Sequence, residues 1–342
     1  MKFSVLQFFS WPERRVPLPA VYERALERIR IMDASGYDAV WLAEHHFGSY
    51  GVCPSVYLMA MHVAGMTRTL RIGTAVSLAA FYHPLRLAEE VALLDVLSGG
   101  RVNWGAGRGF DRREFACFDV APADSHARFR EHVEIVLAAW RHERLTYRGR
   151  FHSFEDVEVL PKPAQAPHPP VWIASSSDEA VAWSAENGHA ILMDPHSSHA
   201  SIAAKYRDYR RVLAAHGHTI DQDIPMARLI ALARTERQAE RVARSGAAWI
   251  FNAYANPATA SAATGLGKHQ ADIARREDPL ERYLEDVVVY GTPARVIDEL
   301  RRLEEAIPLR YLLAAPLSHE SFELLTDEVM PYLGDSRTST TP

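Results

Sequence analysis

Two adjacent histidines and a carboxylate stand out in the segment Trp41-Leu-Ala-Glu-His-His-Phe47. They follow an apolar run, Tyr37 to Ala43, which has the length and composition of a buried parallel strand. In an α/β barrel, catalytic side chains emerge at the carboxyl ends of the strands. An imidazole placed there can exchange protons with a bound reactant near neutral pH, or orient it by hydrogen bonding. The segment therefore predicts an enzyme.

Two further turns could hold an anion. Gly105-Ala-Gly-Arg-Gly109 follows an apolar run, and its glycines would let the backbone approach a ligand while its arginine forks onto a phosphate. Ser175-Ser-Ser-Asp178 follows a second apolar run and opens a helix, whose free amides suit an anion. The glycine turn lacks the helix spacing of a dinucleotide fingerprint. Ser177 or Asp178 would equally serve as a simple helix cap.

Metal-binding residue types occur at Asp194, His196 and His199. A metal-dependent barrel needs ligands that converge from several strand ends. The Glu44-His-His46 segment lacks the spacing of such ligands, because adjacent residues on an extended chain point in opposite directions. We therefore expect no metal site.

Strand-length apolar runs alternate with amphipathic helical stretches almost from end to end, which indicates a parallel sheet with crossover helices. The expected strands number eight, which fits a closed (β/α)8 TIM barrel. We expect one domain over residues 1–334, followed by a disordered tail at 335–342. The strands are expected at 3–8, 38–43, 70–76, 102–106, 170–174, 190–193, 226–233 and 310–315.

Two stretches interrupt the alternation. Residues 144–170 contain five prolines and predict an extended connection rather than a helix. Residues 252–284 combine small residues with Pro257, Gly265 and Gly267. This composition fits a mobile lid inserted over the carboxyl end of a strand, although an insertion without function fits equally well.

Composition narrows the class of protein. A net charge of −5 offers no basic field for nucleic acid. The apolar run at the N-terminus breaks at Trp11-Pro12, too early for an export signal or a membrane span. Cys53 and Cys117 are the two cysteines and lie in unrelated segments, so we expect neither a disulfide nor a zinc site. These features together predict a cytoplasmic protein.

The order of the motifs closely resembles the bacterial luciferase-like flavin monooxygenases, in particular their alkanal-monooxygenase branch. The resemblance covers nearly the whole chain. It rests on the Glu44-His-His-Phe47 segment, Gly73-Thr-Ala-Val76, His83-Pro84, the glycine turn at 105–109, Gly291-Thr-Pro-Ala-Arg295 and Val329-Met-Pro-Tyr-Leu333.

This resemblance implies a two-component flavoprotein. A separate NAD(P)H:flavin reductase would supply reduced FMN (FMNH2), which reacts with O2 to give a C4a-(hydro)peroxyflavin. The protein would position the flavin and exclude water. Oxygen would pass to an organic substrate by hydroxylation, epoxidation or Baeyer-Villiger insertion. The resemblance also implies a homodimer, in which helices at 55–66 and 84–97, rich in small residues, form the interface.

The resemblance carries over to individual residues. His45 matches the family's catalytic histidine, which supports the peroxyflavin or relays a proton. We expect Glu44 to orient His45, and His46 to have a structural role.

The expected cofactor contacts lie on three other segments. Arg108 matches the arginine that grips the FMN phosphate. Ser176, through its backbone N–H, and Ser177, through its hydroxyl, match the second phosphate contact, whereas Ala180 replaces a further hydroxyl. Ala75-Val76 matches a non-prolyl cis peptide under the isoalloxazine ring.

The sequence also departs from luciferase. Gly107 replaces a reactive cysteine, Asp111 replaces an aromatic residue, and residues 252–284 are not lysine-rich. We therefore expect no light emission, and a bulkier substrate at Gly107, such as a polyketide-like intermediate of antibiotic biosynthesis. Two alternatives remain: an F420-dependent hydride-transfer enzyme of the same superfamily, and a flavin-binding protein without catalysis. His45, Arg108 and the long lid segment argue against the second.

Overall fold

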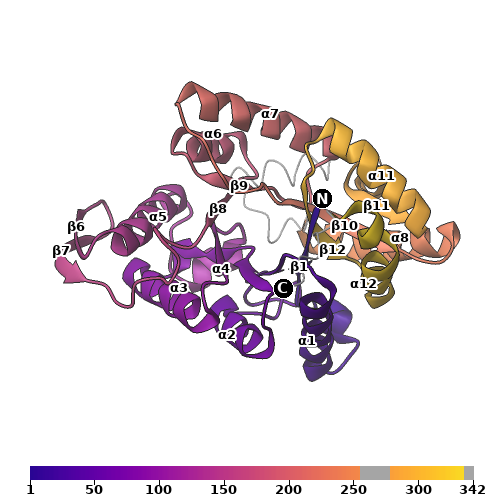
Figure 1. The fold of residues 1–342 in the computed structure, drawn as a ribbon, viewed down its shortest axis with the longest axis horizontal. Coiled ribbons are helices and arrows are strands. Elements are labelled where there is room, and N and C mark those ends of the chain that lie inside the picture. Colours follow the sequence, from indigo (N-terminus) through magenta and orange to yellow (C-terminus); the bar gives the residue numbers. More distant parts are fainter. Residues whose placement is uncertain (255–277, 335–342) are drawn as a thin grey trace, which may run out of the picture.

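The computed structural model describes residues 1–254 and 278–334. Within these ranges, eight parallel strands succeed one another around a ring (Figure 1). One parallel bridge, between Met193 and Met226, joins the two ends of the ring. The strands, in order around the ring, are β1 (Lys2–Gln7), β2 (Ala39–Leu42), β3 (Arg71–Thr74), β5 (Val102–Gly107), β8 (Val171–Ala174), β9 (Ala190–Leu192), β10 (Met226–Leu232) and β12 (Tyr311–Pro316).

The expected barrel is thus confirmed, and each predicted strand overlaps an observed one. Three features were not predicted. β4 (Ser77–Leu78) extends the pairing with β5, and β11 (Val288–Gly291) pairs with the second half of β10. In the proline-rich segment, β6 (Arg144–Arg148) and β7 (Ser153–Glu158) form an antiparallel hairpin outside the barrel. No helix was expected there, and none is observed.

Helices surround the ring (Figure 1). Two helices end at the expected glycines. Gly36 and Gly99 follow the helices at 18–35 and 84–98 and adopt positive φ angles of 79° and 71°, which ends each helix. The helices are α1 (Leu18–Ser35), α2 (Val56–Met66), α3 (Pro84–Ser98), α4 (Arg112–Cys117), α5 (Ser125–Arg141), α6 (Asp178–Glu186), α7 (His199–Ala215), α8 (Glu236–Tyr254), α10 (Pro279–Val287), α11 (Pro293–Ala306), α12 (His319–Leu324) and α13 (Met330–Leu333), with short turns η1 (Pro12–Arg14), η2 (Ala79–Phe81) and η3 (Leu325–Val329).

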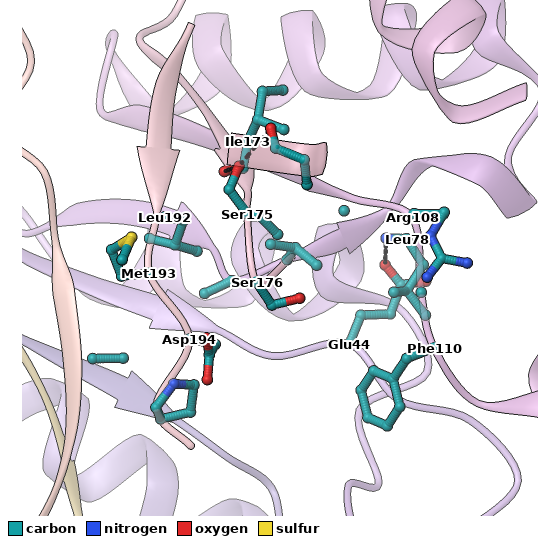
Figure 2. Close-up of a pocket in the computed structure, with 18 of the residues that line it drawn as sticks. Glu44, Leu78, Arg108, Phe110, Ile173, Ser175, Ser176, Leu192, Met193 and Asp194 are labelled. Atoms are coloured by element: carbon teal, nitrogen blue, oxygen red, sulfur yellow. Dashed lines mark hydrogen bonds between the residues drawn. The ribbon is translucent and has the colours of Figure 1, made fainter. Parts of the chain in front are cut away.

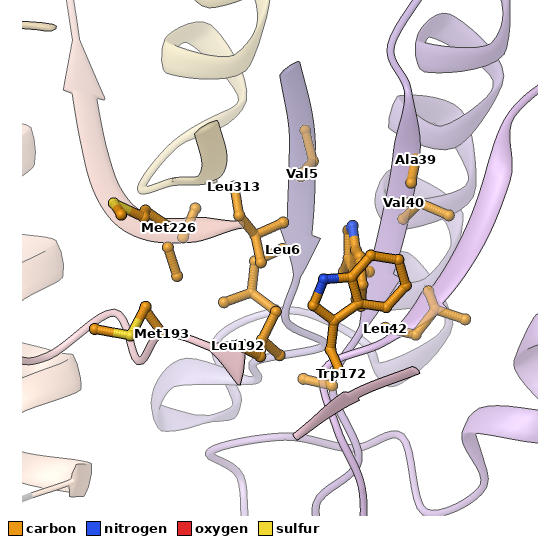
Figure 3. Close-up of a cluster of buried hydrophobic side chains, with 14 of the residues drawn as sticks. Val5, Leu6, Ala39, Val40, Leu42, Trp172, Leu192, Met193, Met226 and Leu313 are labelled. Carbon is orange, nitrogen blue, oxygen red and sulfur yellow. The ribbon is translucent and has the colours of Figure 1, made fainter. Parts of the chain in front are cut away.

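Large side chains fill the inside of the barrel (Figure 3). Trp41 and Trp172 meet edge to face with ring centroids 5.1 Å apart. Gly73 makes room for this pair, since a Cβ atom there would lie 2.4 Å from the Trp41 ring. Because these aromatic rings are core, the barrel is closed below and its ligand space must lie at the strand ends.

Most of the expected lid, and the whole expected tail at 335–342, lie outside the described residues. Among the residues that are described, no helix is both long and apolar enough to cross a membrane.

Candidate active site

A cavity of about 1210 Å³, including its open mouth, lies at the carboxyl ends of the barrel strands. All eight residues singled out from the sequence line it: Glu44, His45, Ala75, Val76, Gly107, Arg108, Ser176 and Ser177. They come from the ends of β2, β3, β5 and β8. Leu6, Leu192 and Leu313 of the apolar core also line the cavity (Figure 3). The cavity therefore joins polar walls to an apolar interior, as small-molecule sites do.

His45 lies on the cavity wall with its side chain 13% exposed. Its backbone N–H donates to the carbonyl of Cys53 at 3.2 Å, which holds the loop after β2. The ring meets those of Tyr50 and Phe110 edge to face, with centroids 4.7 Å and 5.9 Å away. The imidazole is thus fixed by two aromatic neighbours, both of which also line the cavity.

The expectation that Glu44 orients His45 is wrong. Glu44 instead contacts His46, with 3.0 Å between Oε1 and Nε2. The buried carboxylate also accepts hydrogen bonds from the backbone N–H of Leu78 at 3.0 Å and the hydroxyl of Tyr82 at 2.9 Å. The physical reason is the extended backbone, on which residues two apart share a side and adjacent residues do not. Glu44 and His46 therefore form a structural pair.

The carboxylate that faces His45 is Glu114, a residue that the sequence analysis missed. Its Oε1 lies 3.7 Å from His45 Nδ1 and accepts a hydrogen bond from the backbone N–H of His46 at 2.9 Å. Glu114 is buried, and its Oε2 has no hydrogen-bond partner among the described residues. A carboxylate on this side of the ring favours the tautomer that carries its hydrogen on Nδ1. No sequence signal pointed to Glu114, because it comes from α4, about seventy residues after His45.

The peptide bond between Ala75 and Val76 is cis, as expected. It lies on the cavity wall next to Gly107. A Cβ atom at Gly107 would lie 2.2 Å from Cγ2 of Val76, so any side chain there would clash. The extra room expected at Gly107 is thus taken by Val76, and the reason for a bulkier, polyketide-like substrate falls away.

One end of the cavity is built for an anion. Arg108 lies there with its guanidinium over the Phe115 ring, 5.7 Å from the centroid, and it donates to the Ser125 hydroxyl at 3.0 Å. Burial lowers the Arg108 pKa to about 10, against the opposing effect of Glu179, so the group stays charged at neutral pH. Ser176, just before α6, lines the same cavity and is drawn between Arg108 and Asp194 in Figure 2. These groups supply the donor set that a phosphate requires.

Ser177 has the capping role that its sequence also allowed. Its hydroxyl oxygen accepts a hydrogen bond from the N–H of Ala180 at 3.2 Å and so caps α6. The hydroxyl proton can still be donated to a ligand, so the cap and a phosphate contact are compatible.

Two basic residues at this end of the cavity were not predicted from the sequence. They are His126 and Arg130, which line the cavity one turn apart on α5. The His126 pKa is lowered, first by burial and then by the positive charge of Arg108. Arg130 pairs with Glu179 at 2.7 Å and lies over the Trp183 ring. The sequence pattern that could have predicted them is their spacing of four residues, because residues four apart lie on the same face of a helix.

Figure 2 shows Asp194, which follows β9, on the side of the cavity away from Arg108. His196 follows on the same loop and also lines the cavity. Asp194 accepts hydrogen bonds from the backbone N–H groups of His196 and Ser197, at 2.9 Å and 2.7 Å. Lys205 lies 3.7 Å from the same carboxylate. Among the described residues, no group of three or more potential ligands could hold a metal ion.

The family model of luciferase-like monooxygenases matches residues 1–309. Among curated relatives, the alkanal monooxygenase alpha chain of the Kryptophanaron alfredi symbiont is 24% identical over 336 residues, covering 92% of this chain and 93% of the relative. The oxygenase component of the flavin-dependent trigonelline monooxygenase of Acinetobacter baylyi is 28% identical over 198 residues, covering 57% and 54%. The chain spans about half the length of this and two other curated relatives.

Solved structures give the same picture of the fold. The monooxygenase RslO1 of Streptomyces bottropensis superposes with a TM-score of 0.81 at 25% identity, covering 97% of this chain and 99% of that one. The oxygenating constituent of 3,6-diketocamphane monooxygenase of Pseudomonas putida, in complex with FMN, gives 0.79 at 19% identity, with the same coverage. An F420-dependent secondary alcohol dehydrogenase has the same fold, with a TM-score of 0.77 at 16% identity, covering 98% and 99%. With the family model matching most of its length, the chain belongs to the luciferase-like monooxygenases.

Proposed function

We propose that this protein is the oxygenase component of a two-component monooxygenase, which binds reduced FMN and transfers one oxygen atom from O2 to an organic substrate. The observation that carries the proposal is the cavity itself. It holds a half-buried arginine and a helix start at one end, a histidine with a facing carboxylate on another wall, and the close-packed pair Val76 and Gly107 on the same lining.

The residues fit reduced FMN on chemical grounds. Arg108 uses one hydrogen bond, to Ser125, among the described residues, and its remaining donors suit a phosphate. Ser176 and Ser177 at the start of α6 would complete the phosphate contact. Val76 and Gly107 offer a close-packed surface against which a flat ring system would lie.

Reduced FMN, when bound, supplies the electrons that activate O2. Glu114 favours a proton on His45 Nδ1, which leaves Nε2 free to accept a proton from a reacting group and return it. The Tyr50 and Phe110 rings pack on the imidazole and keep water from this wall. Glu44 acts indirectly, because its pairing with His46 fixes the loop that carries His45.

Binding measurements test the cofactor. The protein is titrated with FMN, riboflavin and F420. FMN should bind more tightly than riboflavin, because riboflavin lacks the phosphate that would contact Arg108. Tighter binding of F420 than of FMN in either redox state would contradict the proposal and favour hydride transfer.

We further propose a homodimer formed through α2 and α3. Leu58 and Leu97 are 77% and 61% exposed, and Leu93 and Val96 add to the same two helices. Such an apolar surface is typical of an interface. Light scattering should give a dimer for the native chain and a monomer for Leu97→Arg; a native monomer would contradict the proposal.

A further inference from the structure

A hydrogen-bonded chain of three side chains runs along the cavity wall that carries Asp194. His196, on the loop after β9, lies between two tyrosine hydroxyls. Its Nδ1 is 2.6 Å from the hydroxyl of Tyr283 in α10, and its Nε2 is 3.3 Å from the hydroxyl of Tyr50 on the loop after β2. His196 and Tyr50 both line the cavity, so the chain ends at the ligand space.

The two distances indicate the direction of the chain. Hydrogen bonds from a hydroxyl are shorter than those from a ring N–H. The short contact therefore fits Tyr283 donating its proton to Nδ1, and the longer one fits Nε2–H donating to the Tyr50 oxygen. A neutral imidazole has one donor and one acceptor nitrogen, so this assignment satisfies both sides of the ring. It leaves the Tyr50 hydroxyl proton available to another acceptor.

Tyr50 is held firmly in place. Its ring stacks on Trp249 with centroids 5.9 Å apart, lies 5.8 Å from Phe8, and meets His45 at 4.7 Å. Burial raises the Tyr50 pKa, so the phenol keeps its proton. Among the described residues, His196 is the hydrogen-bond partner of this hydroxyl. A fixed donor next to the candidate catalytic histidine is suited to orient a reactant.

We propose that Tyr50 donates a hydrogen bond to the organic substrate, that His196 and Tyr283 are positioning residues for this donor, and that the substrate carries a carbonyl oxygen as acceptor. This inference rests on the proposed function, since it identifies the substrate class of the same cavity. The nearby wall is apolar, formed by Leu6, Phe8 and Leu313. In such surroundings, a site built to bond an oxygen discriminates strongly against an analogue that lacks it.

A pair of probes of matched shape tests the proposal. Acetophenone and ethylbenzene differ in the carbonyl oxygen, and each is titrated into the FMN-saturated protein while flavin absorbance is followed. We expect the native protein to bind acetophenone more tightly than ethylbenzene. In Tyr50→Phe the ratio of the two dissociation constants should fall about tenfold, which corresponds to the loss of one net hydrogen bond. Tyr147→Phe, which changes a hydroxyl on the β6–β7 hairpin, should leave the preference unchanged. An unchanged preference in Tyr50→Phe would overturn the proposal.

The positioning role needs its own readout. His196→Leu should lower the preference for acetophenone, and His196→Gln should restore it, since an amide offers both a donor and an acceptor. A His196→Leu protein with the native preference would overturn this role.

An FMN titration, together with the same ketone titrations made without FMN and followed by tryptophan fluorescence, distinguishes the two hypotheses. A native protein that binds FMN but shows no preference for acetophenone contradicts only the inference about the substrate. Absence of FMN binding with an intact ketone preference contradicts the proposed cofactor and leaves the Tyr50 donor supported.

Discussion

The cavity carries two kinds of charged group, guanidinium groups and carboxylates, and Figure 2 shows Arg108 away from the carboxylate of Asp194. Cations and a helix start gather around Arg108, where β5 and β8 end. Carboxylates follow two strands on opposite sides of the ring: Glu44 after β2, with Glu114 behind His45, and Asp194 after β9. A ligand with an anionic tail would therefore bind with its tail at Arg108 and away from these carboxylates.

The carboxylates and the arginine also differ in how far their charges are already satisfied. Glu44 accepts two hydrogen bonds and contacts His46, and Asp194 is held by backbone N–H groups and faced by Lys205. Arg108 makes one hydrogen bond among the described residues. Glu44 and Asp194 thus shape the structure, while the arginine has donors left for a ligand. Charge alone therefore does not identify a binding group; the hydrogen-bonding capacity that the group has left does.

The largest effect should follow a change on the His45 side. His45→Ala should keep FMN binding but accelerate the loss of activated oxygen as H2O2 by on the order of 10²-fold, since proton-transfer groups contribute at least that much. Stopped-flow absorbance and a peroxide assay measure the two quantities. His216→Ala, on the exposed end of α7, is the matched control. A native rate of H2O2 release in His45→Ala would show that this side has no role in the chemistry.

The other side should respond in binding instead. Arg108→Ala should weaken FMN about 10- to 100-fold, as expected for a charge-assisted hydrogen bond, and should leave riboflavin binding unchanged. Equilibrium dialysis with both flavins gives the comparison, and Arg108→Lys should restore part of the affinity. Equal weakening of the two flavins would mean that Arg108 does not contact phosphate.

Substitutions of two carboxylates distinguish a structural role from a role in the reaction. Glu44→Gln should lower the free energy of unfolding by about 1–3 kcal/mol, because a buried group with three partners loses its charge. Position 114 faces His45 instead, and Glu114→Gln should change the rate of H2O2 release more than stability. Urea unfolding and a peroxide assay measure these effects. The reverse pattern would contradict the assignment of the two carboxylates.

The smallest effect concerns protons at the phosphate end. The His126 pKa is lowered in the free protein, and a bound phosphate would raise it. The complex then takes up a proton, so FMN affinity should rise as the pH falls from about 8 to about 6. Comparison of native protein with His126→Ala isolates this contribution, because protonation of FMN itself is common to both. Identical pH profiles would place His126 away from the phosphate.

Much of the fold followed from the sequence, because apolar strands and glycine-capped helices leave local signals. The barrel strands and the cis peptide at Ala75-Val76 were both expected, the first from periodicity and the second from resemblance. The β6–β7 hairpin was missed because its strands are largely exposed, and because the prolines that follow it, at 161–170, led us to expect an extended connection over the whole segment.

The site was predicted less completely. Each expected residue lines the cavity, but Glu44 was paired with the wrong histidine and Val76 occupies the space that Gly107 seemed to free. Glu114 and Tyr283 reach the site from distant segments, and such contacts depend on tertiary packing that no local pattern encodes.

The most direct test of the proposed oxygen activation is a rapid-mixing experiment, in which protein with photoreduced FMN is mixed with oxygenated buffer. We predict a slowly decaying absorbance, distinct from reduced and oxidised FMN, which shortens sharply in His45→Ala while Arg108→Ala changes only the FMN concentration needed to reach it. Immediate reoxidation in the native protein, at saturating FMN, would contradict the claim that this cavity protects an oxygen-activating flavin.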